Sequence, residues 1–308
     1  MPLESSLVGL KTGTKRDVAR ALSALDRPAL SEAHATLLDE AFHAPLGKVI
    51  GLTGPPGVGK STLTQALIEK IRAGGQSVAV VAIDPSSQST GGALLGDRTR
   101  LSLNPDDHKL FVRSLAARDR LGGLSDHAIA ATVLLRALYD VVLVETVGIG
   151  QSDADVALIA DRSLLCVQPG SGDSLQFMKA GIMEWPEIIC VTKADTGALA
   201  RRAKADVEGA LGLAVQETKV PVCLVSARTG EGVEALVEAL LRGPYKAQTG
   251  QSAGLLRDAI NRRFGSYGVE RTDLAGCLDA ASGPFGAFLK ASKQLSTWSR
   301  ALRKSCAF

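Results

Sequence analysis

The stretch KVIGLTGPPGVGKST, residues 48–62, decides how this 308-residue chain folds. Its first residues, 48–53, form a short apolar run that predicts a buried strand, and residues 61–75 have the spacing of a helix. Residues 54–61 match the pattern G-x-x-x-x-G-K-[ST] in full. Because glycines let backbone N–H groups turn inward and the helix N-terminus adds partial positive charge, this loop is predicted to hold the phosphates of a nucleoside triphosphate.

Two side chains of this phosphate loop have predicted roles of their own. Lys60 is expected to reach the β- and γ-phosphates, and Ser61 to place its hydroxyl on Mg²⁺. A Gly-rich turn that matches by chance is the alternative, but strand, loop and helix follow in the required order. The residues predicted to contact the nucleotide here are Gly54, Pro55, Pro56, Gly57, Val58, Gly59, Lys60, Ser61 and Thr62.

Short apolar runs continue to alternate with helical stretches after the loop. Further strands are expected at 77–84, 109–115, 140–146, 162–170, 187–195 and 220–227, and helices at 125–139, 173–184, 198–211 and 232–241. Strands this apolar are covered on both faces, and the alternation implies crossover connections. The pattern therefore predicts an α/β fold with a mostly parallel sheet and helices on both faces.

The tetrapeptide TKAD, residues 192–195, follows an apolar run and predicts which base is bound. An Asp carboxylate accepts hydrogen bonds from N1–H and the exocyclic amine of guanine, whereas adenine has an acceptor at N1, so the site rejects it. One helix and one strand later, the tripeptide SAR, residues 226–228, resembles a loop that closes over guanine through backbone N–H groups. The predicted guanine contacts are Thr192, Lys193, Asp195, Ser226, Ala227 and Arg228, so the nucleotide is expected to be GTP.

Two carboxylates end strands that flank the phosphate loop. Asp84 and Glu145 therefore lie where the β- and γ-phosphates and Mg²⁺ of a nucleotide sit, with a solvated strand end or a helix cap as the alternative. Glu145 opens ETVG, residues 145–148, in the slot where most GTPases carry D-x-x-G. It is one methylene longer than Asp, so a water can intervene between it and the metal. Gly148 is expected to give a backbone N–H to the γ-phosphate, and the polar segment 85–100 has the length of a switch segment.

These strings resemble the GTPase chaperones of adenosylcobalamin-dependent acyl-CoA mutases, the ArgK/MeaB type that includes the human methylmalonic aciduria type A protein. The resemblance covers roughly residues 48–228. It rests on GLTGPPGVGKST (51–62), VAIDPSSQSTGGALLGDRTR (81–100), ETVGIGQSD (145–153), PGSGDSLQFMKAGIME (169–184), TKAD and SAR. It implies a phosphate-loop GTPase fold, and the short N-terminal helices also fit it. The helical C-terminal extension is predicted from the residues themselves, because 243–308 has the pattern of short helices.

The resemblance also implies a function and its partners. The chain is expected to hydrolyse GTP to GDP, to gate the loading of adenosylcobalamin into a mutase, and to protect or reactivate that mutase. A homodimer and bound Mg²⁺ are implied, whereas the chain itself is expected to bind no cobalamin. The expected domains are an N-terminal helical segment (1–45), a GTPase domain (46–242) and a C-terminal extension (243–308), a candidate dimerisation or partner-binding arm.

Carried over by position, the resemblance assigns roles to several further side chains. Arg100 is implied as a nucleotide contact, and residues 171–182 as a third switch in which Gln176 and Lys179 respond to the partner. Gln151 is a candidate for the water-orienting group, but it lies three residues after Gly148 and not one, so a helix-start or partner-contact role is at least as consistent with its position. The implied Mg²⁺ shell is Ser61, Asp84, Asp97, Glu145 and Thr146. The implied catalytic set is Lys60, Asp97, Glu145 and Lys179.

Other functions stay open at this point. A metallochaperone GTPase for a nickel enzyme needs a His-rich tract or a Cys/His ligand cluster, and the four histidines are scattered. A small-molecule kinase needs a lid and a substrate pocket, and the guanine motif argues against it. A scaffold that does not hydrolyse GTP is disfavoured because Lys60 and Ser61 are intact.

Composition excludes several classes of protein. With 45% hydrophobic and 22% charged residues, the chain is neither disordered nor fibrous. No apolar run approaches the roughly 18 residues of a membrane helix, and the N-terminus lacks an apolar signal-peptide core. Five cysteines without a C-x-x-C pair predict buried reduced thiols. We therefore expect a soluble cytoplasmic protein with no membrane partner.

The net charge of +3 is an average over two unlike parts. Residues 241–308 hold 11 Lys and Arg against 4 Asp and Glu, a net of +7, and the rest carries 24 against 28, a net of −4. The same segment holds seven of the twelve aromatic residues. A basic, aromatic-rich segment is typical of a protein-contact surface as well as of a packed helical cap. Nucleic-acid binding has no other support in the sequence. In this segment, and in Thr192 where Asn is usual, the chain departs from the family it resembles.

Overall fold

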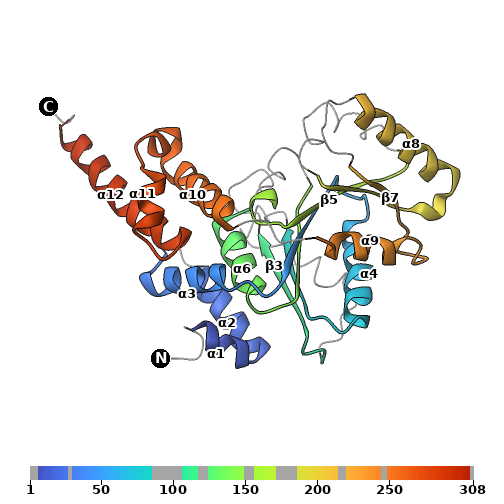
Figure 1. Ribbon diagram of the computed structural model, residues 1–308, viewed down its shortest axis with the longest axis horizontal. Helices are drawn as coiled ribbons and strands as arrows, with labels where there is room; N and C mark the ends of the chain where they lie inside the picture. The colour runs from blue at the N-terminus through green and yellow to red at the C-terminus, as the bar shows by residue number, and fades with distance from the viewer. Residues whose placement is uncertain are drawn as a thin grey trace, which may run out of the picture. The chain divides into compact units, whose positions relative to one another are not determined.

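Seven strands form one sheet in which every neighbouring pair is parallel, in the order β3-β2-β4-β1-β5-β6-β7 (Figure 1). The computed structural model describes residues 6–26, 30–84, 106–116, 124–148, 156–170, 186–213, 220–243 and 248–305. The strands are β1 (Lys48–Thr53), β2 (Val78–Asp84), β3 (Leu110–Ala116), β4 (Val141–Glu145), β5 (Arg162–Val167), β6 (Ile188–Val191) and β7 (Val222–Leu224). The predicted α/β fold with a parallel sheet is confirmed.

Strand β1 lies at the centre of the sheet, where Leu52 is in register with Glu145 of β4 and with Leu164 of β5. Because all seven strands run the same way, their carboxyl ends meet at one edge. In open parallel sheets this edge is where ligands bind. The register therefore brings segments from across the chain to one place, beginning with the phosphate loop that follows β1.

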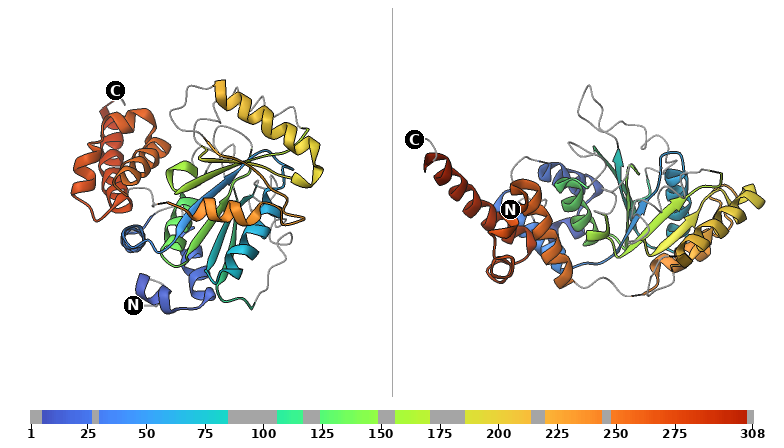
Figure 2. Two further views of the ribbon diagram at one scale, coloured as in Figure 1. Left: turned by 45° about the vertical axis from the view of Figure 1, so that its right-hand side comes forward. Right: turned by 90° about the horizontal axis from the view of Figure 1, so that it is seen from above.

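Helices cover both faces of the sheet, as the runs of buried apolar residues in the strands require. Helix α4 (Lys60–Ala73) and α9 (Val233–Leu241) pack on one face, with Leu63, Leu67 and Leu236 in a common core with the strands. Helix α8 (Ala198–Leu213) packs on the opposite face of β5–β7, around Ile189 and Val207. Helix α6 (Asp126–Arg136) packs against β1, β2 and β4, opposite α4 (Figures 1 and 2).

The chain divides into two compact units. Residues Leu46–Tyr245 form the sheet unit, which holds all seven strands. Residues Met1–Pro45 and Lys246–Phe308 together form the helical unit. Its helices are α1 (Leu7–Thr12), α2 (Lys15–Leu25), α3 (Glu32–His43), α10 (Gln248–Glu270), α11 (Leu274–Asp279) and α12 (Pro284–Ser305) (Figure 2). The segments 1–45 and 243–308, which the sequence analysis treats separately, thus contribute to one unit.

A buried carboxylate joins the two halves of the helical unit. Asp39 of α3 is 1% exposed and accepts three hydrogen bonds from the start of α12. The donors are the Ser282 hydroxyl (3.0 Å), the Phe285 N–H (2.9 Å) and the Gly286 N–H (3.0 Å). A carboxylate at a helix N-terminus satisfies orphan N–H groups and complements the helix dipole. Asp39 therefore fixes α12 on α3.

Element boundaries differ from the sequence-based expectation in a few places. Helix α3, within the predicted N-terminal helical segment 1–45, begins at Glu32 because the Ser31 hydroxyl accepts from the His34 N–H and caps it. The run 220–227 forms a strand only over Val222–Leu224, and the chain turns at residues 227–229, where the Gly230 N–H donates to the Ser226 carbonyl. The expected helix at 173–184 lies outside the described residues.

Candidate functional site

The candidate site lies at the carboxyl edge of the sheet, where four predicted motifs come together. The phosphate loop follows β1, Glu145 ends β4 and Asp84 ends β2. Thr192 follows β6, and Ser226 follows β7. The strands that carry them are neighbours or next neighbours of β1 except for β7, which lies at the sheet's end beside β6. These motifs meet at one edge because a parallel sheet gathers the carboxyl ends of its strands.

The phosphate loop approaches the sheet closely at its first residue. Gly54 has φ +139°, and a Cβ there would lie 2.2 Å from the Cys166 carbonyl oxygen, so only glycine fits. The loop ends at Gly59, a left-handed residue that starts α4. Lys60, 7% exposed, donates from Nζ to the carbonyl oxygens of Gly54 (2.6 Å) and Pro55 (3.2 Å). Its ammonium is thus held over the loop, where the phosphates of a nucleotide are expected.

Glu145 is held between two hydroxyls of α4. Ser61 Oγ donates to Glu145 Oε1 at 2.7 Å, and Thr64 Oγ1 donates to Glu145 Oε2 at 2.9 Å. Both carboxylate oxygens therefore have a donor, which a carboxylate that is 5% exposed requires. Ser61 and Thr64 lie three residues apart, on the same face of the helix. The structure thus joins two predicted metal-site residues, Ser61 and Glu145, directly.

The residues after Glu145 pack against the phosphate loop. Thr146, which is buried, donates through its hydroxyl to Thr53 Oγ1 at 3.1 Å, and its N–H donates to the Leu52 carbonyl at 3.0 Å. Gly148 has φ +81°, and a Cβ there would lie 1.7 Å from the Gly54 carbonyl oxygen and 2.8 Å from Lys60 Nζ. Gly148 therefore lies directly against the loop, which is where its predicted contact with a γ-phosphate requires it.

The oxygen groups at this edge fit a hard cation such as Mg²⁺. Mg²⁺ prefers oxygen ligands and retains several waters, so it needs only one or two protein groups beside the phosphates. Ser61 supplies a hydroxyl, and Asp84, which is 2% exposed, ends β2 two residues beyond the register partner of Glu145. Within the described ranges, no three His, Cys, Asp or Glu side chains form a ready-made metal cluster. The described residues thus suit a metal whose shell the nucleotide completes.

The guanine motif is tied to the phosphate loop through Thr192. Its hydroxyl lies 2.7 Å from the Val58 carbonyl oxygen and 3.1 Å from that of Val167. Lys193 is left-handed (φ 55°), the one non-glycine residue with positive φ in the described segments, and Nζ donates to Gly57 O at 3.2 Å. A positive φ at a lysine is a strained conformation that occurs preferentially at functional sites. Lys193 thus crosses toward the phosphate loop.

The Asp195 carboxylate contacts both polar side chains of the SAR segment, Ser226 and Arg228. Ser226 Oγ donates to Asp195 Oδ1 at 2.7 Å, and Arg228 Nε lies 3.4 Å from Oδ2. The Ser226 hydrogen bond is the main cause that lowers the pKa of Asp195 below its ordinary value of 3.8. The carboxylate is therefore ionised, as acceptance from guanine requires. Since the Arg228 side chain is 81% exposed, that ion pair is screened and contributes little to stability.

Five predicted residues lie outside the described residues: Asp97, Arg100, Gln151, Gln176 and Lys179. Their predicted roles stay predictions. In the other direction, the sequence analysis missed Thr64 and Gln168, although both contact predicted residues. Gln168 Oε1 accepts from Lys193 Nζ at 2.5 Å. Thr64 lies three residues after Ser61, on the same helix face, and this spacing was the sequence pattern that could have indicated its position near Glu145.

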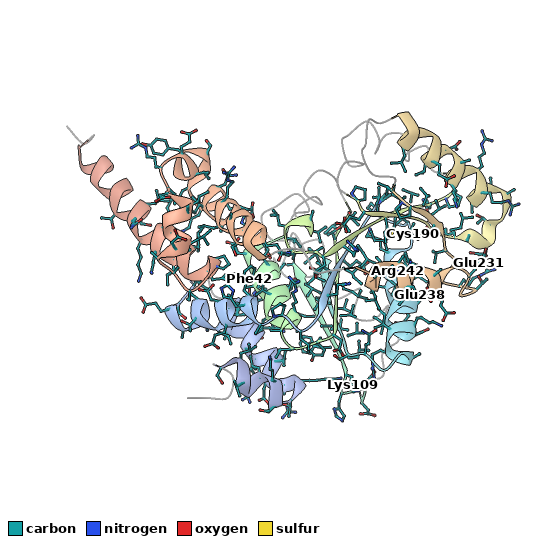
Figure 3. All side chains as sticks on the ribbon, viewed as in Figure 1. Phe42, Lys109, Cys190, Glu231, Glu238 and Arg242 are labelled. Atoms are coloured by element: carbon teal, nitrogen blue, oxygen red, sulfur yellow. The ribbon has the colours of Figure 1, made fainter. Side chains whose placement is uncertain are left out.

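Three cysteines lie side by side beneath this edge. Cys166, Cys190 and Cys223 are in register on β5, β6 and β7, and the first two are fully buried (Figure 3 labels Cys190). The hydrogen bond with Cys166, followed by burial, raises the pKa of Cys190 well above its usual value. Among the described cysteines all are free thiols, which agrees with the predicted reduced state. A protonated buried thiol is inert, so Cys166 and Cys190 serve packing, whereas Cys223 is half-buried.

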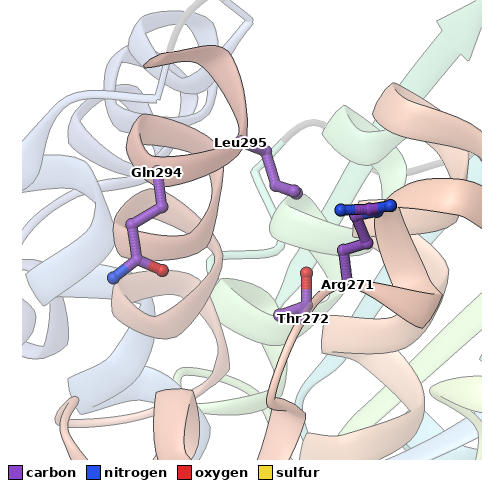
Figure 4. Close-up of a pocket in the computed structure, with 4 residues that line it drawn as sticks. All are labelled: Arg271, Thr272, Gln294 and Leu295. Carbon is purple, nitrogen blue, oxygen red and sulfur yellow. The ribbon is translucent and has the colours of Figure 1, made fainter. Parts of the chain in front are cut away.

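One pocket of the helical unit holds none of the predicted nucleotide residues. It has a volume of about 490 Å³ and is lined by Arg271, Thr272, Gln294 and Leu295 (Figure 4). The Arg271 guanidinium stacks on the Tyr267 ring at 4.6 Å, and the Thr272 hydroxyl donates to Gly268 O at 2.7 Å.

In the described part of the chain, no helix is both long enough and apolar enough to cross a membrane.

Comparison with known proteins agrees with these motifs. The family described as methylmalonyl-CoA mutase-associated GTPase MeaB matches residues 18–263. A Pyrococcus horikoshii protein named as a GTPase is 39% identical over 250 residues, which are 77% of this chain and 76% of that protein. The mouse mitochondrial methylmalonic aciduria type A homolog is 39% identical over 61% of this chain and 47% of its own length. Escherichia coli GTPase ArgK is 38% identical over 63% of this chain and 60% of its own length.

Two solved structures share the fold at low sequence identity. A LAO/AO transport system kinase superposes with a TM-score of 0.65 at 22% identity, over 96% of this chain and 97% of that one. HypB from Helicobacter pylori, in complex with nickel, superposes with a TM-score of 0.51 at 16% identity, over 68% of this chain and 92% of HypB. At such identities the likeness shows the fold alone.

Proposed function

Since this chain belongs to the MeaB family of methylmalonyl-CoA mutase-associated GTPases, we propose that it acts as the GTP-hydrolysing chaperone of a cobalamin-dependent acyl-CoA mutase. In this role it gates adenosylcobalamin loading and protects or reactivates the mutase. The observation that carries the proposal is the junction of two motifs at one edge of the sheet: the Thr192 hydroxyl, at the head of the guanine motif, donates to Val58 of the phosphate loop. A site so joined binds base and phosphates as one unit.

The phosphate-loop residues position the reacting groups. Lys60 neutralises charge on the β- and γ-phosphate oxygens, and the loop N–H groups of residues 54–61 hold the leaving group. Gly148 gives its N–H to the γ-phosphate. Phosphoryl transfer to water needs little covalent chemistry from the protein, so positioning and charge neutralisation supply most of the rate.

Mg²⁺ belongs to this proposal because the donor groups present suit it. When bound, it would neutralise charge on the phosphate oxygens. Ser61 and Asp84 would hold it, and Glu145 would orient the Ser61 hydroxyl and accept from a bound water. Asp97 and Thr146 complete the proposed shell. Thr146 also donates a hydrogen bond to Thr53 Oγ1, which holds its side chain at the proposed metal site.

The base site selects guanine through Asp195. Its carboxylate accepts from N1–H and the exocyclic amine, while Ser226, Ala227 and Arg228 close over the base. The lowered pKa of Asp195 supports this role because it keeps the acceptor ionised. Thr192 and Lys193 position the motif against the phosphate loop.

Partner contacts are proposed for three side chains and for the C-terminal extension. Gln151, Gln176 and Lys179 are the proposed side chains that respond to the partner, and Arg100 the proposed further contact to the nucleotide. The extension 243–308 is the proposed dimerisation or partner-binding arm. Its net positive charge and its aromatic residues favour a protein surface.

The test is GTP turnover by the full chain, alone and with each candidate cobalamin-dependent mutase. Slow intrinsic turnover, strong preference for GTP over ATP and acceleration by one mutase are expected. Lys60→Ala should lower turnover about 100-fold or more without unfolding the chain, which controls for a contaminating hydrolase. No acceleration by any mutase would contradict the chaperone role and favour a metallochaperone GTPase or a small-molecule kinase. Equal use of ATP would contradict the base assignment.

A further inference from the structure

We propose that Thr64 is the positioning residue of the metal side of this site: its hydroxyl fixes the carboxylate of Glu145 so that the other carboxylate oxygen faces Ser61. The inference rests on the proposed function, since it concerns how that function's Mg²⁺ shell is held. It concerns a residue outside the G-x-x-x-x-G-K-[ST] pattern, three positions after Ser61 on the inner face of α4.

The geometry divides the two oxygens of Glu145 between two donors. Thr64 Oγ1 lies 2.9 Å from Oε2, and Ser61 Oγ lies 2.7 Å from Oε1. Thr64 is 0% exposed, whereas Ser61 is partly exposed. The bond to Thr64 is therefore on the closed side of the carboxylate and the bond to Ser61 on the open side. A ligand that enters from solvent meets Ser61 and Oε1, while Thr64 keeps Oε2 in place behind them.

The direction of the Thr64 hydroxyl differs from that of three other helical threonines, Thr36, Thr132 and Thr297. A threonine inside a helix commonly donates to the carbonyl four residues before it. Thr36, Thr132 and Thr297 do so, at 2.8–3.0 Å. Thr64 instead donates across to the end of β4. The Thr64 hydroxyl thus donates its hydrogen bond to the Glu145 carboxylate and not to a carbonyl of its own helix.

A glutamate needs this support more than an aspartate does. Its additional methylene adds a rotatable bond, so its carboxylate reaches more positions from a fixed backbone. The end of β4 is fixed, because Leu52 is in register with Glu145 and the Leu52 carbonyl accepts from the Thr146 N–H. Thr64 removes the remaining freedom at the side chain. Precise placement of a metal-site carboxylate commonly depends on such a hydrogen-bonded neighbour.

The experiment compares GDP affinity in Mg²⁺ with GDP affinity in EDTA, by calorimetry on the full chain. The Mg²⁺/EDTA ratio, which is the affinity in Mg²⁺ divided by the affinity in EDTA, isolates the contribution of the metal from base and phosphate binding. Thr64→Val preserves shape and removes the donor, and Thr64→Ser restores it. Thr132→Val is the matched control, because Thr132 is also a buried helical threonine of the sheet unit but donates to its own helix. Thr64→Ala is the second variant should valine not fold.

The expected result is a fall of about tenfold in the Mg²⁺/EDTA ratio for Thr64→Val, with GDP affinity in EDTA within about threefold of wild type. Thr64→Ser and Thr132→Val should keep the wild-type ratio. In a Glu145→Gln background, Thr64→Val should lower the ratio no further, because the two residues act as one unit. A wild-type ratio in Thr64→Val, or an equal loss with and without metal, overturns the inference and leaves the GTPase site standing. A wild-type chain with no Mg²⁺ effect overturns both the metal site and the inference.

Discussion

The Thr192 hydroxyl lies 2.7 Å from the carbonyl oxygen of Val58, although 134 residues separate them in the chain. Thr192 opens the predicted guanine motif and Val58 belongs to the predicted phosphate loop, so this bond joins the two halves of the proposed nucleotide site. Because both groups are buried, the bond is shielded from water and its loss leaves a carbonyl oxygen short of a partner.

Replacing Thr192 by valine tests this junction. Thr192→Val keeps the side-chain volume and removes the donor, so we expect GDP affinity to fall by about 5- to 30-fold, the equivalent of about 1–2 kcal/mol. Calorimetry with GDP measures the effect, and Thr192→Ser, which retains a hydroxyl, should stay close to wild type. Wild-type affinity in the valine variant would show that the two motifs bind independently.

Exchange of the Asp195 carboxylate for an amide should change the preferred base. Asp195→Asn loses an acceptor for guanine and gains a donor that suits the C2 oxygen of xanthine. We expect affinity for GDP to fall by about 100-fold or more, and xanthosine diphosphate to bind more tightly than GDP. Competition against a fluorescent nucleotide gives both constants. Parallel losses for both nucleotides would indicate a misfolded loop, and an unchanged GDP affinity would remove Asp195 from the base site.

The pH dependence of guanine selectivity follows from Ser226. Its hydrogen bond holds the pKa of Asp195 below 3.8, so the carboxylate stays charged as the pH falls. The ratio of GDP to ADP affinity should therefore be flat from pH 8 to about 5, and any loss should begin only near or below 3.8. Ser226→Ala removes the main cause of the lowered Asp195 pKa. In this variant the ratio of GDP to ADP affinity should begin to fall at a higher pH than in the wild type. A wild-type ratio that falls between pH 7 and 5 would mean that another group reads the base.

How far the sequence predicts this site depends on where each contact lies. The pairing of Asp195 with Ser226 and the position of Gly148 against Gly54 follow from motifs at the ends of parallel strands, which must meet at one edge. Thr64 could not be predicted with the same rule. Its helical spacing is compatible with a hydroxyl that bonds its own helix or a neighbouring strand, and only the packing of α4 on β4 decides between them.

The helical unit was harder to predict for a different reason. Asp39 and Ser282 are 243 residues apart, and neither belongs to a sequence motif that predicts its contact partner. Amphipathic spacing predicts that helices such as α3 and α12 bury a face, but it does not say against which helix. The pairing of the first and last segments of the chain therefore emerges only in three dimensions.

Removal of the Asp39 carboxylate should destabilise the helical unit. Asp39→Ala deletes three hydrogen bonds at the start of α12 and leaves two backbone N–H groups without their acceptor. A loss of about 2–4 kcal/mol in the free energy of unfolding is expected, from a lost helix cap and lost charge-assisted bonds. Chemical denaturation followed by circular dichroism measures it. Glu40→Ala, an exposed carboxylate next to it on the same helix, is the control and should change stability by less than about 0.5 kcal/mol.

Gly148 offers a direct test of the contact between the ETVG segment and the phosphate loop. A Cβ at this position would lie 1.7 Å from the Gly54 carbonyl oxygen and 2.8 Å from Lys60 Nζ, so Gly148→Ala must push the two segments apart. Since the displaced groups are those that hold the γ-phosphate, we expect GTP turnover to fall about 100-fold or more. Single-turnover hydrolysis measures the chemical step.

The control for Gly148→Ala must share its backbone strain without its clash. Gly75, at the far end of α4, has φ +86°, against +81° for Gly148, and no atom lies within 4 Å of a Cβ built there. Gly75→Ala should therefore cost about 1 kcal/mol of stability from the left-handed conformation and leave turnover near wild type. Loss of turnover in Gly148→Ala alone assigns the effect to the contact with Gly54 and Lys60. Equal losses in both variants would assign it to backbone strain, and normal turnover in Gly148→Ala would place the γ-phosphate contact elsewhere.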